Sequence, residues 1–221
     1  MSVSIYVCFS GGKDSLMMLH ELKSAGEWDV VKLITTITAG YDRISMHGVR
    51  RELLHRQAAA LKIPLLEVAI SPQADNDEYE SAMSHAWNQA VQSGIDTIAF
   101  GDIFLQDLKE YRERQLAAHA LKCLFPLWQR STPELVRTFI DLGYRAITTC
   151  VDPRKLDASF AGRIIDDEFL NDLPEGVDPC GENGEFHSFV FDGPLFREPV
   201  SFSRGEVIDR DNFLFCELNP Q

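Results

Sequence analysis

The residues best suited to chemistry lie near the start of the chain, where the segment SGGKDS occupies residues 10–15. Two adjacent glycines let the backbone turn sharply and approach an anion, and the free amides that open a following helix point at phosphate oxygens. Lys13 adds a cation, Asp14 a magnesium ligand, and Ser10 and Ser15 add hydroxyl groups. The segment predicts a phosphate-binding loop, for which a tight turn capped by Asp14 or Ser15 is the structural alternative.

This segment is not the longer mononucleotide loop, in which a glycine and four further residues precede Gly-Lys-Ser/Thr. The position five residues before Gly12 is Val7, and Asp14 follows the lysine. A different kind of phosphate loop is indicated.

A second polar segment, DPCGENGEFHS, occupies residues 178–188. One interpretation is a turn at 182–184 that leads into a strand at 186–191, with His187 and Phe189 on one face and Phe186 and Ser188 on the other. The other is a functional loop, because loops dense in titratable groups often carry binding or catalytic residues. The spacing alone does not decide between them.

The side chains of this segment allow two kinds of chemistry. Cys180, Glu182, Glu185 and His187 are all metal-ligand types, but their spacing matches no standard zinc pattern and they mix soft with hard donors. A substrate loop is favoured, in which Glu182, Glu185 and His187 act as catalytic groups in proton transfer or ammonia capture.

Periodicity in the first 142 residues predicts alternating strands and helices. The predicted strands are 4–9, 30–37, 65–70 and 97–100, and the predicted helices are 15–25, 47–61, 76–93, 105–121 and 133–142. Short apolar strands joined by helices predict an α/β fold, a parallel sheet with helices on both faces. After about Cys150, frequent glycines and prolines predict a smaller α+β portion packed on the main sheet.

Such a sheet places three segments at one edge, because ligands bind beyond the carboxyl ends of parallel strands. They are the loop after the first strand, the segment after the second strand, and Gly101 with Asp102 after the fourth. Asp102 is a candidate to orient ribose, hold magnesium or bind an amine, and a helix cap is its structural alternative. Arg112 either neutralises a substrate charge or forms a surface ion pair with a neighbouring glutamate.

Composition narrows the class of protein. A net charge of -13 argues against extensive nucleic-acid binding, although a local basic cluster is compatible with one protein or RNA partner. No apolar run approaches the roughly twenty residues of a membrane span and no signal sequence is evident, so the cytoplasm is the expected location. Five scattered cysteines without a CxxC pair support neither a disulfide framework nor a zinc ribbon.

The motifs together resemble a known family. SGGKDS is similar to the pyrophosphate loop of the N-type ATP pyrophosphatases. The full set resembles the diphthine-ammonia ligase family over nearly the whole chain: SGGKDS, the segment GDI with a following YR, FPLW, and DPCGENGEFHSF. Ser188 stands where the family commonly has threonine. The compact form is closer to bacterial relatives, which make no diphthamide, so the acceptor is left open.

The resemblance implies a fold of the adenine nucleotide α-hydrolase type, with a nucleotide-binding domain over 1–125 and a smaller substrate-binding domain over 126–221. It also implies ATP and Mg²⁺ as cofactors, with Asp14 helping to hold the metal. Adenine is expected at the backbone of the second strand, around 34–37. The implied nucleotide-binding residues are Ser10, Gly11, Gly12, Lys13, Asp14, Ser15, Ile37, His47 and Gly101, and the implied catalytic residues include Lys13, Asp14 and Asp102.

The activity that follows is ATP-dependent ligation through adenylation: a carboxylate attacks the α-phosphate, pyrophosphate leaves, and ammonia or another amine displaces AMP. The carboxylate acceptor is a protein side chain or a small molecule. A regulatory module that binds ATP or AMP without turnover is the alternative. Sulfur insertion into RNA is disfavoured by the acidic balance and the lack of paired cysteines. A homo-oligomer is compatible with the sequence, which does not fix the oligomeric state.

Overall fold

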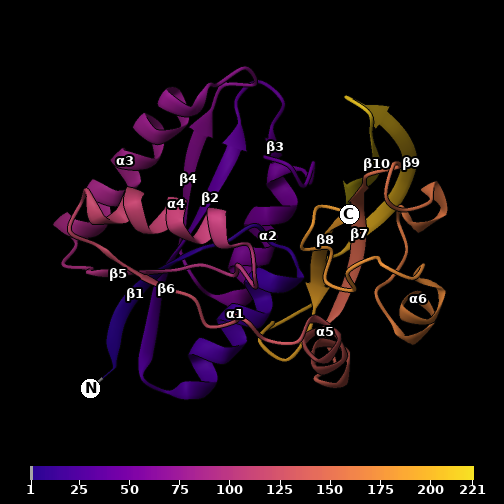
Figure 1. Ribbon diagram of the computed structural model, residues 1–221, viewed down its shortest axis with the longest axis horizontal. Coiled ribbons are helices and arrows are strands. Elements are labelled where there is room, and N and C mark those ends of the chain that lie inside the picture. Colours follow the sequence, from indigo (N-terminus) through magenta and orange to yellow (C-terminus); the bar gives the residue numbers. More distant parts are fainter. Residues whose placement is uncertain (1) are drawn as a thin grey trace.

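A parallel β-sheet forms the main body of the protein, whose computed structural model describes residues 2–221 (Figure 1). Strand β1 lies at its centre between β2 and β5, β2 also pairs with β4, and β5 with β6, all in parallel. The short β3 pairs antiparallel with the end of β2. In the described residues the strands of this sheet are β1 (Val3–Cys8), β2 (Trp28–Thr38), β3 (Arg43–Ile44), β4 (Leu65–Ile70), β5 (Thr97–Ala99) and β6 (Lys122–Leu124).

Helices cover both faces of this sheet, as the sequence predicts. Successive side chains of β1 point to opposite faces, so that Ile5 and Val7 belong to the core beneath α1 and α2, while Tyr6 belongs to the core beneath α3 and α4. The helices are α1 (Lys13–Ala25), α2 (Arg51–Leu61), α3 (Asn76–Gln92) and α4 (Gln106–Ala117). In residues 2–221 no helix is long and apolar enough to cross a membrane.

The rest of the chain builds a second, antiparallel sheet on the α1 and α2 side of the first (Figure 1). Its strand order is β8-β7-β10-β9. Two helices and a short 3-10 turn accompany it, so this portion is α+β as predicted. The elements are α5 (Thr132–Asp141), β7 (Arg145–Val151), the 3-10 turn Ala158–Phe160, α6 (Asp167–Asp172), β8 (Phe186–Asp192), β9 (Phe202–Arg210) and β10 (Phe213–Pro220). The domain boundary at 125/126 stays a prediction, and it falls just after β6.

Two predicted helices differ from the structure by four residues at one end, and the others by one or two residues. The helix expected from His47 begins at Arg51, because Met46 and Gly48 have positive φ angles of 65° and 68° that a right-handed helix cannot contain. The helix expected over 105–121 ends at Ala117, because Ala120 adopts a φ of 56° and turns the chain into β6. A strand as short as β6 carries too few residues to show an alternating pattern.

The two sheets are joined where β8 reaches the loop after β1. The Val190 amide donates to the Gly11 carbonyl at 2.9 Å. Gln57 of α2 is fully buried, and its side-chain amide donates to the carbonyls of Gly11 at 2.9 Å and Val190 at 2.6 Å. One glutamine therefore bonds both partners of the junction.

Replacement of Gln57 tests this junction. We expect Gln57→Ala to lower the free energy of unfolding by about 2 to 4 kcal/mol, because two buried carbonyls lose a donor and a cavity remains. Urea denaturation measures the change. The matched control is Gln89→Ala on the exposed side of α3, which should change stability by less than about 0.5 kcal/mol. Equal effects of the two substitutions would contradict the assigned role of Gln57.

Candidate active site

A cavity of about 430 Å³ lies at the carboxyl ends of β1 and β5 and against Ile34, Thr35 and Thr36 within β2. Its size falls within the range of small-molecule sites. The structure brings together here the three segments that the sequence predicts at one sheet edge, and adds the 180–188 segment from the second sheet. Both polar motifs of the sequence thus face one space.

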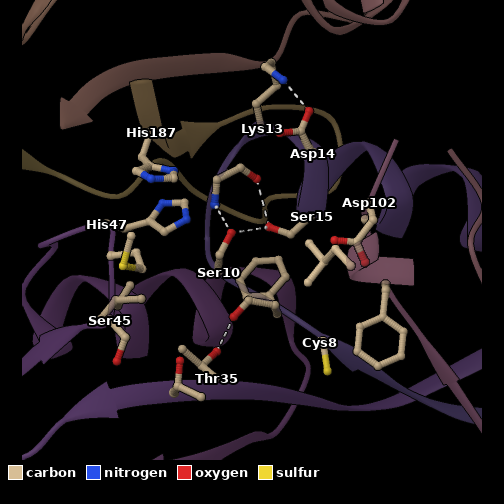
Figure 2. A pocket seen from close by; sticks show the side chains of 18 of the residues that line it. Cys8, Ser10, Lys13, Asp14, Ser15, Thr35, Ser45, His47, Asp102 and His187 are labelled. Atoms are coloured by element: carbon tan, nitrogen blue, oxygen red, sulfur yellow. Dashed lines mark hydrogen bonds and ion pairs between the residues drawn. The ribbon is translucent and has the colours of Figure 1, made fainter. Parts of the chain in front are cut away.

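The phosphate loop, residues 10–15, is held by its own hydroxyl groups and by β8 (Figure 2). The Gly12 amide donates to Ser10 Oγ at 3.3 Å, and Ser15 Oγ donates to the Gly12 carbonyl at 2.9 Å. The Lys13 amide donates to Ser188 Oγ at 3.1 Å. Since α1 begins at Lys13, the amides of its first turn have no acceptor within the helix and favour an anion.

Lys13 is buried, with 1% of its surface exposed, and pairs with the carboxylate of Asp14. Figure 2 shows this pair apart from the hydroxyl groups of Ser10 and Ser15, which face each other. Burial opposes the Lys13 charge, yet Asp14 and Cys180 outweigh it and the pKa of Lys13 is raised. Lys13 therefore stays positively charged, and the Asp14 carboxylate is paired with it.

Gly11, within residues 10–15, and Gly101, on the cavity wall, each allow a close approach by a neighbouring group. Gly11 has a φ of 78°, and a Cβ atom there would lie 2.6 Å from Gln57 Oε1. A Cβ atom on Gly101 would lie 3.2 Å from the backbone of Asp14 in the first turn of α1. Gly101 thus lines the cavity and also lets the end of β5 pack against the phosphate loop.

His47 and His187 face each other on one wall, with ring centroids 4.6 Å apart (Figure 2). His47 Nδ1 lies 3.1 Å from the Ser188 carbonyl oxygen, which only accepts, so Nδ1 carries the proton. Burial lowers the pKa of His47, and burial together with His47 lowers the pKa of His187 to about 3. Both imidazoles are neutral at physiological pH.

Asp102 and Arg112 form a bidentate ion pair at the opposite side of the cavity. Arg112 Nε lies 2.6 Å from Asp102 Oδ2, and Nη2 lies 3.2 Å from Oδ1. The guanidinium also stacks on the Phe100 ring at 4.6 Å. Arg112 therefore pairs with an aspartate inside the site, and neither Glu110 nor Glu113 is its partner.

Glu182 connects the loop from the second sheet to the first sheet. Its Oε1 accepts from the Ile103 amide at 2.8 Å and from the Phe104 amide at 3.4 Å. The pKa of Glu182 is raised to about 7, chiefly by burial and also by the Asp14 and Asp102 carboxylates, while the two backbone amides oppose the rise. Glu182 is thus a cavity group that gains and loses a proton near neutral pH.

Three residues named from the sequence do not line this cavity: Gly11, Glu185 and Ile37. Gly11 lies against Gln57 of α2 instead. Glu185 is buried in its own loop, where Oε1 accepts from the Asp178 amide and from Asn183 Nδ2, both at 3.1 Å. This geometry suits a residue that shapes the loop. Ile37 points into the hydrophobic core, whereas Ile34, Thr35 and Thr36 of the same strand line the cavity.

Several lining residues have no local motif in the sequence. Thr35 of β2 donates to the Phe9 carbonyl, and Ser45 lies on the loop after β3 (Figure 2). Tyr79 and Met83 of α3 form an apolar wall with residues that follow β5. Their i, i+4 spacing identifies one face of a helix but does not say whether that face meets core or ligand. Phe100, Leu105 and Leu108 complete the wall.

The residues present suit a magnesium ion that arrives with phosphates. In the part of the chain that the structure describes, no group of three His, Cys, Asp or Glu side chains is arranged to hold a metal. Asp14, Asp102 and Glu182 all line the cavity, but each already has a protein partner. Mg²⁺ commonly uses one or two carboxylates together with substrate phosphates, and this donor set fits that mode.

Comparison with known proteins matches both parts of the chain. The model of the diphthamide synthase N-terminal domain matches residues 3–122, and that of the diphthamide synthase C-terminal domain matches residues 131–217. The chain is similar to curated proteins named diphthine-ammonia ligase. The zebrafish (Danio rerio) protein is 27% identical and the alignment covers 95% of this chain and 90% of that protein. The human (Homo sapiens) protein is 27% identical and the rat (Rattus norvegicus) protein 30%, each over 90% of this chain and 82% of theirs.

Among solved structures, a U34-tRNA thiolase from Methanococcus maripaludis overlaps 65% of this chain and 59% of its own. The TM-score is 0.42 at 15% identity, a likeness too weak to support an argument about function.

The raised pKa of Glu182 predicts how stability depends on pH. The folded protein holds the Glu182 proton up to about pH 7, whereas an unfolded glutamate loses it near 4.5. The folded state therefore binds more protons between these values, and stability falls as pH rises through them. We expect wild type to lose about 1 to 2 kcal/mol relative to Glu182→Gln between about pH 5 and pH 8.

Denaturation of the two proteins across this pH range measures the effect. Glu168→Gln, at an exposed position of α6, is the matched control and should keep a constant difference from wild type. A Glu182→Gln difference that is also constant with pH would contradict the raised pKa.

Proposed function

The chain belongs to the diphthamide synthase family, and from that premise we propose that it is an ATP-dependent ligase that joins ammonia to a carboxylate. The observation that carries the proposal is the single cavity in which the phosphate loop meets Glu182 and His187 of the 180–188 segment. A module that only binds a nucleotide has no need for a titrating carboxylate beside the phosphates. The acceptor is diphthine or another carboxylate.

The first step is adenylation. A carboxylate oxygen of the acceptor attacks the α-phosphorus of ATP, the bond to the oxygen that bridges the α- and β-phosphates breaks, and pyrophosphate leaves. Negative charge grows on pyrophosphate, and donors fixed in advance stabilise such charge. The Asp14 and Ser15 amides in the first turn of α1, the Ser10 and Ser15 hydroxyls and the Lys13 ammonium belong to residues at this wall of the cavity and supply those donors.

Lys13 has to exchange partners in this step. In the structure its charge is matched by Asp14. We assign Asp14 as the residue that would hold magnesium, which would leave the Lys13 ammonium available to the phosphates. Magnesium held there would supply additional positive charge against the departing pyrophosphate.

The second step forms the amide. The nitrogen lone pair of ammonia attacks the acyl carbon, the carbon-oxygen bond to AMP breaks, and the nitrogen loses one proton. Glu182 is the candidate to accept that proton, because its pKa of about 7 suits exchange at neutral pH. His187, whose pKa is lowered to about 3, is a poor proton acceptor and acts instead as a neutral hydrogen-bonding wall.

Product analysis tests the function directly. With magnesium-ATP, ammonium and a productive carboxylate, we expect AMP and pyrophosphate in equal amounts. Lys13→Ala should lower their formation by about a hundredfold or more, because the leaving group loses its cation. Lys23→Ala, at an exposed position in the last turn of α1, is the matched control and should retain activity. Formation of ADP and phosphate would contradict adenylation.

The pH dependence of turnover tests the role of Glu182. At saturating ammonia, kcat should rise with pH through about 7 as Glu182 becomes a carboxylate. Glu182→Gln should remove this step and lower kcat by about 10²-fold. The reaction rate of wild type and variant from about pH 5.5 to 8.5 gives the two profiles. A profile that is unchanged in Glu182→Gln would exclude this residue as the proton acceptor.

A further inference from the structure

A small recess lies next to the main cavity, between α3, α4 and the end of β5. Its volume is about 20 Å³, which is room for one molecule the size of water. Four residues line both spaces: Tyr79, Met83, Phe100 and Arg112. The other residues line only the recess: Glu80, Trp87, Tyr111, Gln115 and Leu116. The recess is thus separated from the active-site cavity by side chains common to both.

The indole of Trp87 leaves a hydrogen-bond donor unmatched in this region. Trp87 is 4% exposed, and its Nε1 is buried without a partner in the structure. A buried donor without an acceptor costs about 1 to 3 kcal/mol, and the great majority of such groups in native proteins have a partner. A hydrogen-bond acceptor the size of water, bound in the recess, would give the Trp87 N–H its missing partner.

The unmatched Trp87 donor favours an occupant with a lone pair. The charges alone do not select it, because the recess is lined by both the Arg112 guanidinium, which Asp102 pairs at 2.6 Å, and the Glu80 carboxylate. Ammonium has no lone pair and leaves the Trp87 N–H unmatched, whereas ammonia has one lone pair and three N–H groups. Glu80 and the Tyr111 hydroxyl are acceptors for those N–H groups. The pKa of Tyr111 is raised to about 12, by burial and by Glu80, so this hydroxyl keeps its proton.

We propose that this recess binds the ammonia consumed in the ligase reaction, with the lone pair accepting from Trp87 Nε1–H, and that its size selects ammonia over larger amines. The inference rests on the proposed function, because it assigns a place to the amine of that reaction. Ammonia leaves the recess past the shared wall of Tyr79, Met83 and Phe100 to reach the acyl carbon in the main cavity.

Amine selectivity is the first test. Leu116 is fully buried and lines the recess but not the main cavity, so Leu116→Ala enlarges the recess alone. Wild type should prefer ammonia strongly over methylamine, and Leu116→Ala should lower the ratio of their kcat/KM values by about tenfold or more. Leu121→Ala is the matched control, since Leu121 belongs to the same core cluster and lines neither space.

The donor is tested with Trp87→Phe, which keeps an aromatic ring and removes the N–H. We expect KM for ammonia to rise about tenfold, the equivalent of one hydrogen bond, with KM for ATP and kcat at saturating ammonia unchanged.

The pH dependence of KM in wild type tests which form binds. KM expressed as the total concentration of ammonia and ammonium should fall about tenfold for each pH unit near neutrality, while KM expressed as the concentration of free ammonia stays constant.

A binding measurement separates this inference from the proposed function. With Trp28 and Trp128 replaced by phenylalanine, Trp87 is the sole tryptophan of the chain. Ammonium chloride near pH 9 should then change its fluorescence in a saturable way, and sodium chloride or methylammonium chloride should not. This signal is expected whether or not any acceptor has been identified.

The outcomes are distinct. AMP formation with ammonia, together with unchanged amine selectivity in Leu116→Ala and unchanged KM in Trp87→Phe, would overturn the recess as an ammonia site and leave the ligase function intact. A Trp87 signal that sodium chloride reproduces would overturn it as well, and would assign the recess to water. Saturable ammonia binding without AMP formation would support the recess and overturn the proposed function.

Discussion

The docking of β8 onto the phosphate loop is the interaction on which the rest of the site depends. Val190 and Ser188 of β8 bond directly to Gly11 and Lys13, and Gln57 of α2 bonds both chains from a fully buried position. Backbone groups of the loop are therefore satisfied by a segment about 175 residues away in the chain. The same strand carries His187 into the cavity, so one junction both shapes the loop and completes the site.

Charge in the cavity is held in matched pairs. Lys13 pairs with Asp14 and Arg112 with Asp102, because an isolated buried charge is strongly unfavourable. Glu182 has backbone amides instead of a cation, and its pKa is raised to about 7. The protein therefore presents an acid that titrates near neutrality between fixed ion pairs.

Much of the first sheet could be predicted from the sequence, because its strands alternate with helices and end at clear turn residues. The residues of the 10–15 loop and Glu182 also stand out in the sequence as parts of local motifs.

The features that could not be predicted depend on partners that are distant in the sequence. The sequence left Arg112 open between a substrate contact and a surface ion pair with a neighbouring glutamate, and its partner in the structure is Asp102. Glu185 belongs to the same motif as Glu182, but its carboxylate turns into its own loop. Gln57 belongs to no recognisable sequence motif, and its role depends on contact with Val190 of β8, which is distant in the sequence.

The central claim is that phosphate binding requires the loop and β8 together. Hydrogen-deuterium exchange with and without a non-cleavable ATP analogue and magnesium measures it most directly. The account predicts that peptides covering residues 10–15 and 186–192 gain protection together and at the same ligand concentration, because the amides of both are bonded across one junction. Protection of residues 10–15 alone, with 186–192 unchanged, would contradict it and would reduce the second sheet to a neighbour of the nucleotide site.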